Sequence, residues 1–484
     1  MANYASAELK ESLCKKMESA IIDFGKDLDE IFSYYQLLRD NPNIGSQEDR
    51  EVVFTMMDAL SASEMSMIEI WTYIKAEMTA SDLTIRQVLM LNLERSIADY
   101  LLSIFGYITE GREDTIWKRY SVTHNVPEDL YQELITKSDA ILGNNDFWKK
   151  RNVSTHFDFN IKKVHTAYIS ENDEDEIIRF AIEVWDIILP VYLSASCYWK
   201  AAKPIKKLES KPDVNNYIDE VFCKNTNCQK AINEIVTTQV NRTSESAKLS
   251  IRFDGFTTLL RKKKILQQEY HLIVNLNQSI KSFALGDFLL LEYAGAMQST
   301  FATSSSWERR VCMKRTYSIA YEAFEKIIGF DDKSKEVSCL AGLERFINSI
   351  NDNKFVIEVN NIKLEINNII ARFGFDDEKR REVFTHPRYE DRVLVLEQYL
   401  AMKKIRIMDI MASSAMIVRV INRLKSLILN VMSAYSTILE ESNNARWSRM
   451  FDNIRKNTTD ATMIKHSDDF EKQLRKAIDS ILGI

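Results

Sequence analysis

The expected fold is decided by one stretch of the chain, Arg95-Ser-Ile-Ala-Asp-Tyr-Leu-Leu-Ser-Ile-Phe-Gly-Tyr107. Its large apolar side chains recur at the spacing of one helix face; they are Ile97, Tyr100, Leu101, Ile104 and Phe105. Gly106 follows directly, and glycine is the residue most often found just past the end of a helix. The stretch therefore predicts an amphipathic helix that buries one face and ends at Gly106.

The scarcity of glycine and proline extends this expectation to all 484 residues. The chain contains 12 Gly and 6 Pro, whereas average usage would give roughly 34 and 24. Sandwiches, barrels and strand-rich sheets need these residues at their many turns. Hydrophobic residues make up 45% of the chain, which is enough to fill packed cores and argues against disorder. We therefore predict an all-α fold.

The helical pattern is repeated 223 residues further along the chain. Residues 86–106 begin with Arg-x-Val-x-Met and close with Gly, and residues 309–329 do the same. Each copy is followed by Arg-x-Val-x-Thr-His, at 151–156 and again at 381–386. Repetition at a fixed separation is typical of duplicated units. The sequence thus predicts two related antiparallel helical bundles.

Composition and cap signals suggest how the chain is divided. Ser46 looks like a helix start, and further cap signals are Ser61-Ala-Ser-Glu64 and Thr79-Ala-Ser-Asp82. Residues 355–366 fit either a hairpin or a helix that ends near Phe373, and we favour the helix. The expected units are an N-terminal helical extension (1–78), a first bundle (79–203), a polar connecting segment (204–248), a second bundle (249–440) and a polar tail with a terminal helix (441–484).

Charge and targeting signals predict a cytoplasmic chain that does not enter a membrane. The formal charge is −6, and the N-terminus lacks the apolar run of a signal peptide. The most apolar stretch, residues 180–199, is interrupted by Glu183, Asp186 and Pro190. The six cysteines are sparse and irregular, so we expect no metal site, and no nucleotide fingerprint suggests a cofactor.

The two Arg-x4-His motifs are the residues best suited to chemistry. Histidine titrates near neutral pH and can move protons, and arginine offers a rigid fork of donors to charged oxygens. Together they fit metal-independent cleavage of RNA, in which the 2′-hydroxyl loses a proton and the 5′-oxygen gains one. The expected catalytic residues are Arg151 and His156 with Arg381 and His386. Asn152 would share a helix face with His156.

This pattern resembles the HEPN superfamily, whose ribonuclease members carry Arg-x4-6-His, often with Asn directly after the Arg. Arg151, Asn152 and His156 carry the resemblance most fully, and Arg381 and His386 less completely. The resemblance implies paired helical bundles whose two motifs form one composite endoribonuclease site without a metal. It also implies a role in phage defence, such as abortive infection, or as a toxin with a neutralising antitoxin or regulator. A homodimer is the alternative way to pair two motifs.

The second motif departs from this family pattern. Glu382 replaces the Asn, which puts a carboxylate where a phosphate should approach. Pro387 moves His386 away from helical geometry. Either the second half is degenerate or it contributes asymmetrically. The structural alternative is that Arg381 pairs with a neighbouring Glu and His386 is a surface residue, while Arg151 is ion-paired and His156 is a capping or core residue.

Basic residues near the motifs suggest where RNA would bind. Lys149 and Lys150, the expected substrate-binding lysines, precede the first motif, and Lys162 and Lys163 follow it. A second local excess could line an RNA cleft; it comprises Lys403, Lys404, Arg406, Arg419, Arg423 and Lys425. The rival hypothesis, from a different class, is a non-catalytic helical scaffold that binds RNA or a partner protein.

Overall fold

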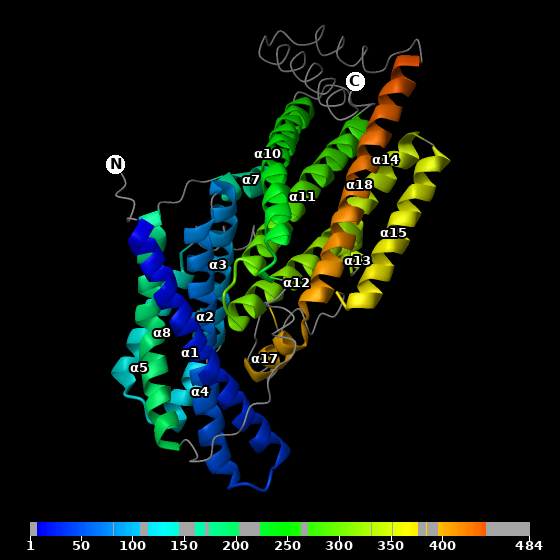
Figure 1. The fold of residues 1–484 in the computed structure, drawn as a ribbon. Helices are drawn as coiled ribbons and strands as arrows, with labels where there is room; N and C mark the ends of the chain where they lie inside the picture. The colour runs from blue at the N-terminus through cyan, green and yellow to red at the C-terminus, as the bar shows by residue number, and fades with distance from the viewer. Residues whose placement is uncertain are drawn as a thin grey trace.

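The computed structural model describes residues 7–80, 82–106, 115–144, 160–169, 174–202, 223–262, 270–330, 332–350, 352–375, 384 and 395–441. Every regular element in these ranges is a helix, and no strand occurs among them (Figure 1). The predicted all-α class is therefore confirmed.

The described part of the chain forms one helix after another, coloured from blue to orange in chain order (Figure 1). Up to residue 202 they are α1 (Ala7–Asp40), α2 (Gln47–Thr79), α3 (Leu83–Phe105), α4 (Ile116–Thr123), α5 (Glu128–Leu142), α7 (Ile161–Ile169) and α8 (Glu174–Ala202). After residue 222 they are α10 (Thr226–Lys262), α11 (Tyr270–Phe301), α12 (Ser306–Ile328), α13 (Asp332–Val337), α14 (Cys339–Ile350), α15 (Asn353–Phe373), α17 (Val395–Lys404) and α18 (Ile407–Glu441).

Most of the predicted helix ends are confirmed. Ser46 and Asp49 form a reciprocal capping box at the start of α2. In the signal Thr79-Ala-Ser-Asp82, Thr79 is the last residue of α2, and Asp82 caps the first backbone N–H groups of α3. Gly106 and Gly329 end α3 and α12 with φ values of 75° and 72°. This left-handed φ range suits glycine because it has no Cβ.

Two further predictions about local structure have clear outcomes. The ambiguous segment 355–366 lies within α15, which ends at Phe373, so the helix prediction is confirmed. The predicted helix start at Ser61 is wrong, because Ser61 is buried in the middle of α2. In this part of α2 hydroxyl groups bond to their own helix backbone, as Ser63 Oγ does to the carbonyl of Ala59 at 2.8 Å. A serine of this kind needs no helix end to satisfy its hydroxyl.

α3 and α12 form the centre of the molecule. Both helices are 23 residues long, and nearly all of their side chains are buried. The apolar face predicted for α3 lies in the core, since Ile97, Leu101, Ile104 and Phe105 are fully buried. Burial of a large apolar side chain contributes about 1.5–3 kcal/mol, so this face is a main source of stability.

Helices in the two parts of the chain have parallel sets of neighbours. α2 packs against α1, α3, α4 and α8, and α11 packs against α10, α12, α14 and α18. α7 lies against α3, α10 and α11. α17 lies against α12 and α2, and it touches α1 where the rings of Tyr399 and Phe32 stack at 4.0 Å. Each of the short helices α7 and α17 thus joins the two parts of the chain.

The expected unit boundaries can be compared with the helices. The boundary at 248/249 falls inside α10, which runs without a break from Thr226 to Lys262. α2 lies almost wholly in the expected N-terminal extension, yet it packs against α3, α4 and α8 of the expected first bundle. The expected terminal helix near 469–482 lies outside the described residues.

One helix among the described residues has the length and composition of a membrane span. The segment Phe180–Ala201 of α8 has a mean hydropathy of 1.4, and 33% of it is buried. A core helix meets the same criterion, and α8 packs against α2 and α5.

Candidate functional site

The residues of both Arg-x4-His motifs lie outside the described residues, as do the two lysines before the first motif. This applies to Lys149, Lys150, Arg151, Asn152, His156, Arg381 and His386. Their predicted roles and mutual distances therefore stay predictions. The described residues on either side define what each motif is attached to.

Phe384 is the one described residue inside the second motif, and it is buried against α12. Its side chain is 3% exposed, and its ring meets the ring of Tyr317 edge-on at 5.2 Å. The Tyr317 hydroxyl in turn donates to the carbonyl of Gly374, just past α15. The second motif is thus anchored to the central helix α12. Sequence reasoning missed this anchor, although an aromatic residue between Arg381 and His386 was a signal for it.

α7, which follows the first motif, is fixed to the rest of the molecule by two buried hydrogen bonds. Gln87 Nε2 on α3 donates to the carbonyl of Ala167 at 2.9 Å. The hydroxyl of Tyr168 donates to the carboxylate of Glu292 on α11. The Asn160 side chain accepts from the backbone N–H of Lys163 at 3.3 Å and so stabilises the start of the helix.

Two buried carboxylates, Glu69 on α2 and Glu292 on α11, form the polar centre of the molecule. Glu69 accepts from the hydroxyls of Ser96 and Tyr100, each at 2.9 Å, and pairs with Lys314 on α12. Glu292 accepts from Arg315 at 2.8 Å as well as from Tyr168. Because buried charges are costly unless they are paired, these contacts are necessary for the fold.

Arg95 is a further buried cation beside this centre. Its Nη1 donates to Asn92 at 3.0 Å, and burial together with the neighbouring Arg315 lowers the pKa of Arg95 to about 10. Burial and the nearby carboxylates raise the pKa values of Tyr100 and Tyr168, so both hydroxyls remain donors at neutral pH. Sequence reasoning missed this centre because its partners come from distant helices.

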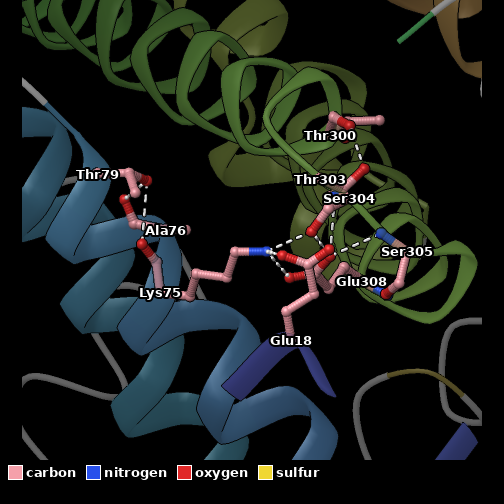
Figure 2. A network of polar contacts seen from close by, with 9 residues as sticks. All are labelled: Glu18, Lys75, Ala76, Thr79, Thr300, Thr303, Ser304, Ser305 and Glu308. Atoms are coloured by element: carbon pink, nitrogen blue, oxygen red, sulfur yellow. Dashed lines mark hydrogen bonds and ion pairs between the residues drawn. The ribbon is translucent and has the colours of Figure 1, made fainter. Parts of the chain in front are cut away.

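A second inter-helix network surrounds Glu308 at the start of α12 (Figure 2). Lys75 extends from α2 and pairs with Glu308 at 2.7 Å, while Glu18 of α1 lies 3.5 Å from the same ammonium. Glu308 also accepts from the backbone N–H groups of Ser304 and Ser305, at 2.9 and 2.8 Å. Burial opposes ionisation of Glu308, yet Lys75 and these N–H groups hold its pKa below the ordinary value.

The expected RNA cleft along α17 and α18 is largely neutralised by acidic partners. Arg419 and Arg423 pair with Glu365 on α15. Lys425 is buried and pairs with Asp287 on α11, and Lys403 lies 3.4 Å from Asp29 on α1. Four of the six basic residues therefore hold helices together, which weakens the hypothesis that this excess binds RNA.

The basic residues after the first motif have a different environment. Lys162 and Lys163 are exposed on α7. His165 is half-buried, and its Nε2 has no hydrogen-bond partner among the described residues. Burial and the neighbouring Lys248 of α10 lower the pKa of His165. No carboxylate among the described residues pairs with Lys162 or with Lys248. The positive charge of these two lysines is therefore not neutralised by the described helices.

Comparisons of the chain with protein families, with curated proteins and with solved structures find no match.

Proposed function

We propose that this chain is a HEPN-like, metal-independent endoribonuclease built from two related halves. The observation that supports this proposal is the parallel set of neighbours around α7 and α17. Each of these helices follows an Arg-x4-His motif, and each packs on helices of both parts of the chain. A composite site requires this kind of arrangement, because two motifs must approach one substrate.

Helix lengths and order support the duplication. α1, α2 and α3 contain 34, 33 and 23 residues, and α10, α11 and α12 contain 37, 32 and 23. The buried acids Glu69 and Glu292 stand at the same 223-residue separation as the ends of α3 and α12. We therefore propose that the duplicated units include α1 and α2 as well as α10, which enlarges the two bundles beyond 79–203 and 249–440.

The proposed chemistry assigns a role to each residue of the first motif. His156 removes the proton from the 2′-hydroxyl or returns one to the 5′-oxygen, and Arg151 holds the charged phosphorane. Asn152 orients the phosphate, with Lys149 and Lys150 binding the neighbouring backbone. The products would be a 2′,3′-cyclic phosphate and a 5′-hydroxyl. Such an activity fits a role in phage defence or as a toxin held in check by an antitoxin or regulator.

The second motif is proposed to contribute less to catalysis. Glu382 brings negative charge, Pro387 restricts His386, and Phe384 is buried against Tyr317. Arg381 and His386 would then assist a site whose main proton transfer falls to His156.

Cleavage of RNA in EDTA by the wild type, His156→Ala and His386→Ala tests this proposal. We expect His156→Ala to lose at least about 100-fold in rate, the usual contribution of a general acid or base, and His386→Ala to lose less. Thermal melting of each variant controls for folding. Equal activity of all three proteins, or activity that EDTA abolishes, would contradict the assigned chemistry.

The rival function, a non-catalytic scaffold, is favoured by one specific observation. Arg419, Arg423 and Lys425 are engaged with carboxylates of neighbouring helices, so α18 offers little free positive charge to RNA. If no variant or wild-type preparation cleaves RNA, the scaffold becomes the better hypothesis.

A further inference from the structure

α7 and α10, which come from different parts of the chain and pack together, both carry exposed basic side chains. α7 provides Lys162 and Lys163, and α10 provides Lys248 and Arg252; all four are exposed. α7 packs against α10, and His165 lies close enough to Lys248 for the two to interact electrostatically. We call these five residues the α7–α10 cluster.

Lys162 and Lys248 have no ion-pair partner among the residues that the structure describes. The acidic residue nearest to Lys248 along α10 is Glu245, which is exposed, and Asp254 further along pairs with Lys281 at 2.6 Å. The buried Nε2 of His165 also lacks a partner. Lys162 and Lys248 therefore offer exposed positive charge to an anion.

The position of the cluster relates it to the first motif. Lys162 follows His156 by six residues, and six residues span at most about 20 Å even when fully extended. A polyanion that lies on the cluster is therefore within reach of the first motif. Lysine binds phosphates as a point charge and does not read bases, so the cluster suits a sequence-independent contact with a nucleic-acid backbone.

The junction between α17 and α1 differs in its charge pairing. His165 is the fifth residue of α7, and Tyr399 is the fifth residue of α17. Tyr399 donates its hydroxyl to Asp29 of α1, which also lies 3.4 Å from Lys403 and 4.0 Å from Arg310. Asp29 thus offsets the charge of Lys403 and Arg310 at this junction, whereas no carboxylate among the described residues pairs with Lys162 or Lys248 beside His165.

We propose that the α7–α10 cluster binds the phosphate backbone of single-stranded RNA on its way to the first motif. This inference rests on the proposed function for its choice of RNA. It adds the surface along which the RNA would reach the motif. RNA would approach along the side of the molecule that α7 and α10 form.

The test measures RNA binding separately from cleavage. His156→Ala serves as the parent protein, and fluorescence anisotropy follows a short fluorescein-labelled single-stranded RNA between about 50 and 200 mM salt. The double variant Lys162→Ala/Lys248→Ala should bind more weakly. The slope of log K against log salt should fall by about 1.4, because each contact to a single strand contributes about 0.7.

The matched control removes two other exposed lysines, Lys230 of α10 and Lys333 of α13. Lys230→Ala/Lys333→Ala changes the net charge equally, and we expect the parent slope. An unchanged slope in Lys162→Ala/Lys248→Ala, or an equal loss in the control, would overturn the inference. Tighter binding of polyglutamate than of RNA of equal charge would also overturn it, since that result would favour an acidic protein as the ligand.

Failure of the proposed function has a different signature. In that case the wild type does not cleave RNA, yet the cluster variant still reduces the salt slope, and the binding inference holds. In the opposite case, cleavage depends on His156 while the cluster variant leaves binding and KM unchanged, and the inference alone is wrong.

Discussion

The α17–α1 junction and the α7–α10 junction each join a short helix to a long one, but they differ in how their basic side chains are paired. At the first, Asp29 meets Lys403, Arg310 and the Tyr399 hydroxyl, and the ring of Tyr399 stacks between those of Phe32 and Trp307 at 4.0 and 5.6 Å. At the second, His165 faces Lys248 and keeps an unbonded nitrogen. The packing of a short helix on its neighbours thus serves cohesion at the first junction and leaves the charge of Lys248 available at the second.

The largest effect is expected where the two parts of the chain share a buried ion pair. Lys314→Ala leaves Glu69 buried without its cation, which should cost about 3–5 kcal/mol in the free energy of unfolding. Urea denaturation measures this loss. Tyr168→Phe on the α7 side should cost less, about 1–3 kcal/mol, because Glu292 keeps Arg315. Equal losses in both variants would show that the α2–α12 ion pair stabilises the fold no more than the α7–α11 hydrogen bond does.

An intermediate effect is expected from Asp29→Ala. The variant removes the acceptor of the Tyr399 hydroxyl and the partner of Lys403, so stability should fall by about 1 kcal/mol. It also releases positive charge, and the salt slope of RNA binding should steepen by about 0.7 if Lys403 then contacts phosphate. Asp23→Ala, which breaks an exposed pair with Lys26 on the same helix, is the control. No change in slope would mean that neutralisation by Asp29 is not what separates the junctions.

The smallest effect on stability is expected from Lys248→Ala. Lys248 is exposed and forms no ion pair with a described residue, so the free energy of unfolding should stay within about 0.5 kcal/mol. The pKa of His165 should rise, because the ammonium of Lys248 disfavours the protonated ring. An NMR titration of the imidazole measures this shift, with Lys230→Ala as the control. A pKa that stays constant or falls would place Lys248 away from His165.

Local sequence signals were sufficient for much of the fold. The apolar spacing around Ile97 predicted the buried face of α3, and Gly106 and Gly329 predicted two helix ends. These features depend only on residues close together in the sequence, so the local sequence pattern is enough to predict them. The prediction at Ser61 was wrong because a serine can cap a helix or bond to the backbone of its own helix, and only burial distinguishes the two.

Long-range pairing could not be predicted in the same way. Lys314 lies 245 residues from Glu69, and Lys425 lies 138 residues from Asp287. No local pattern marks such partners, so the basic residues of α18 were interpreted as a surface for RNA. The motif residues around His156 and His386 stay predictions, and Phe384 is the part of the second motif that the structure describes.

The buried pair between Glu69 and Lys314 has a consequence for how the two proposed halves can evolve. Under the proposed duplication, position 91 in the first half corresponds to position 314, and it holds Leu91, which is fully buried. Two copies of the first half could not pair with each other in this geometry, since Glu69 would meet leucine instead of a cation. Each half is complementary to the other and not to itself. Because one chain holds both halves, substitutions can accumulate in one motif while the other motif stays unchanged. In a homodimer every substitution would change both motifs together.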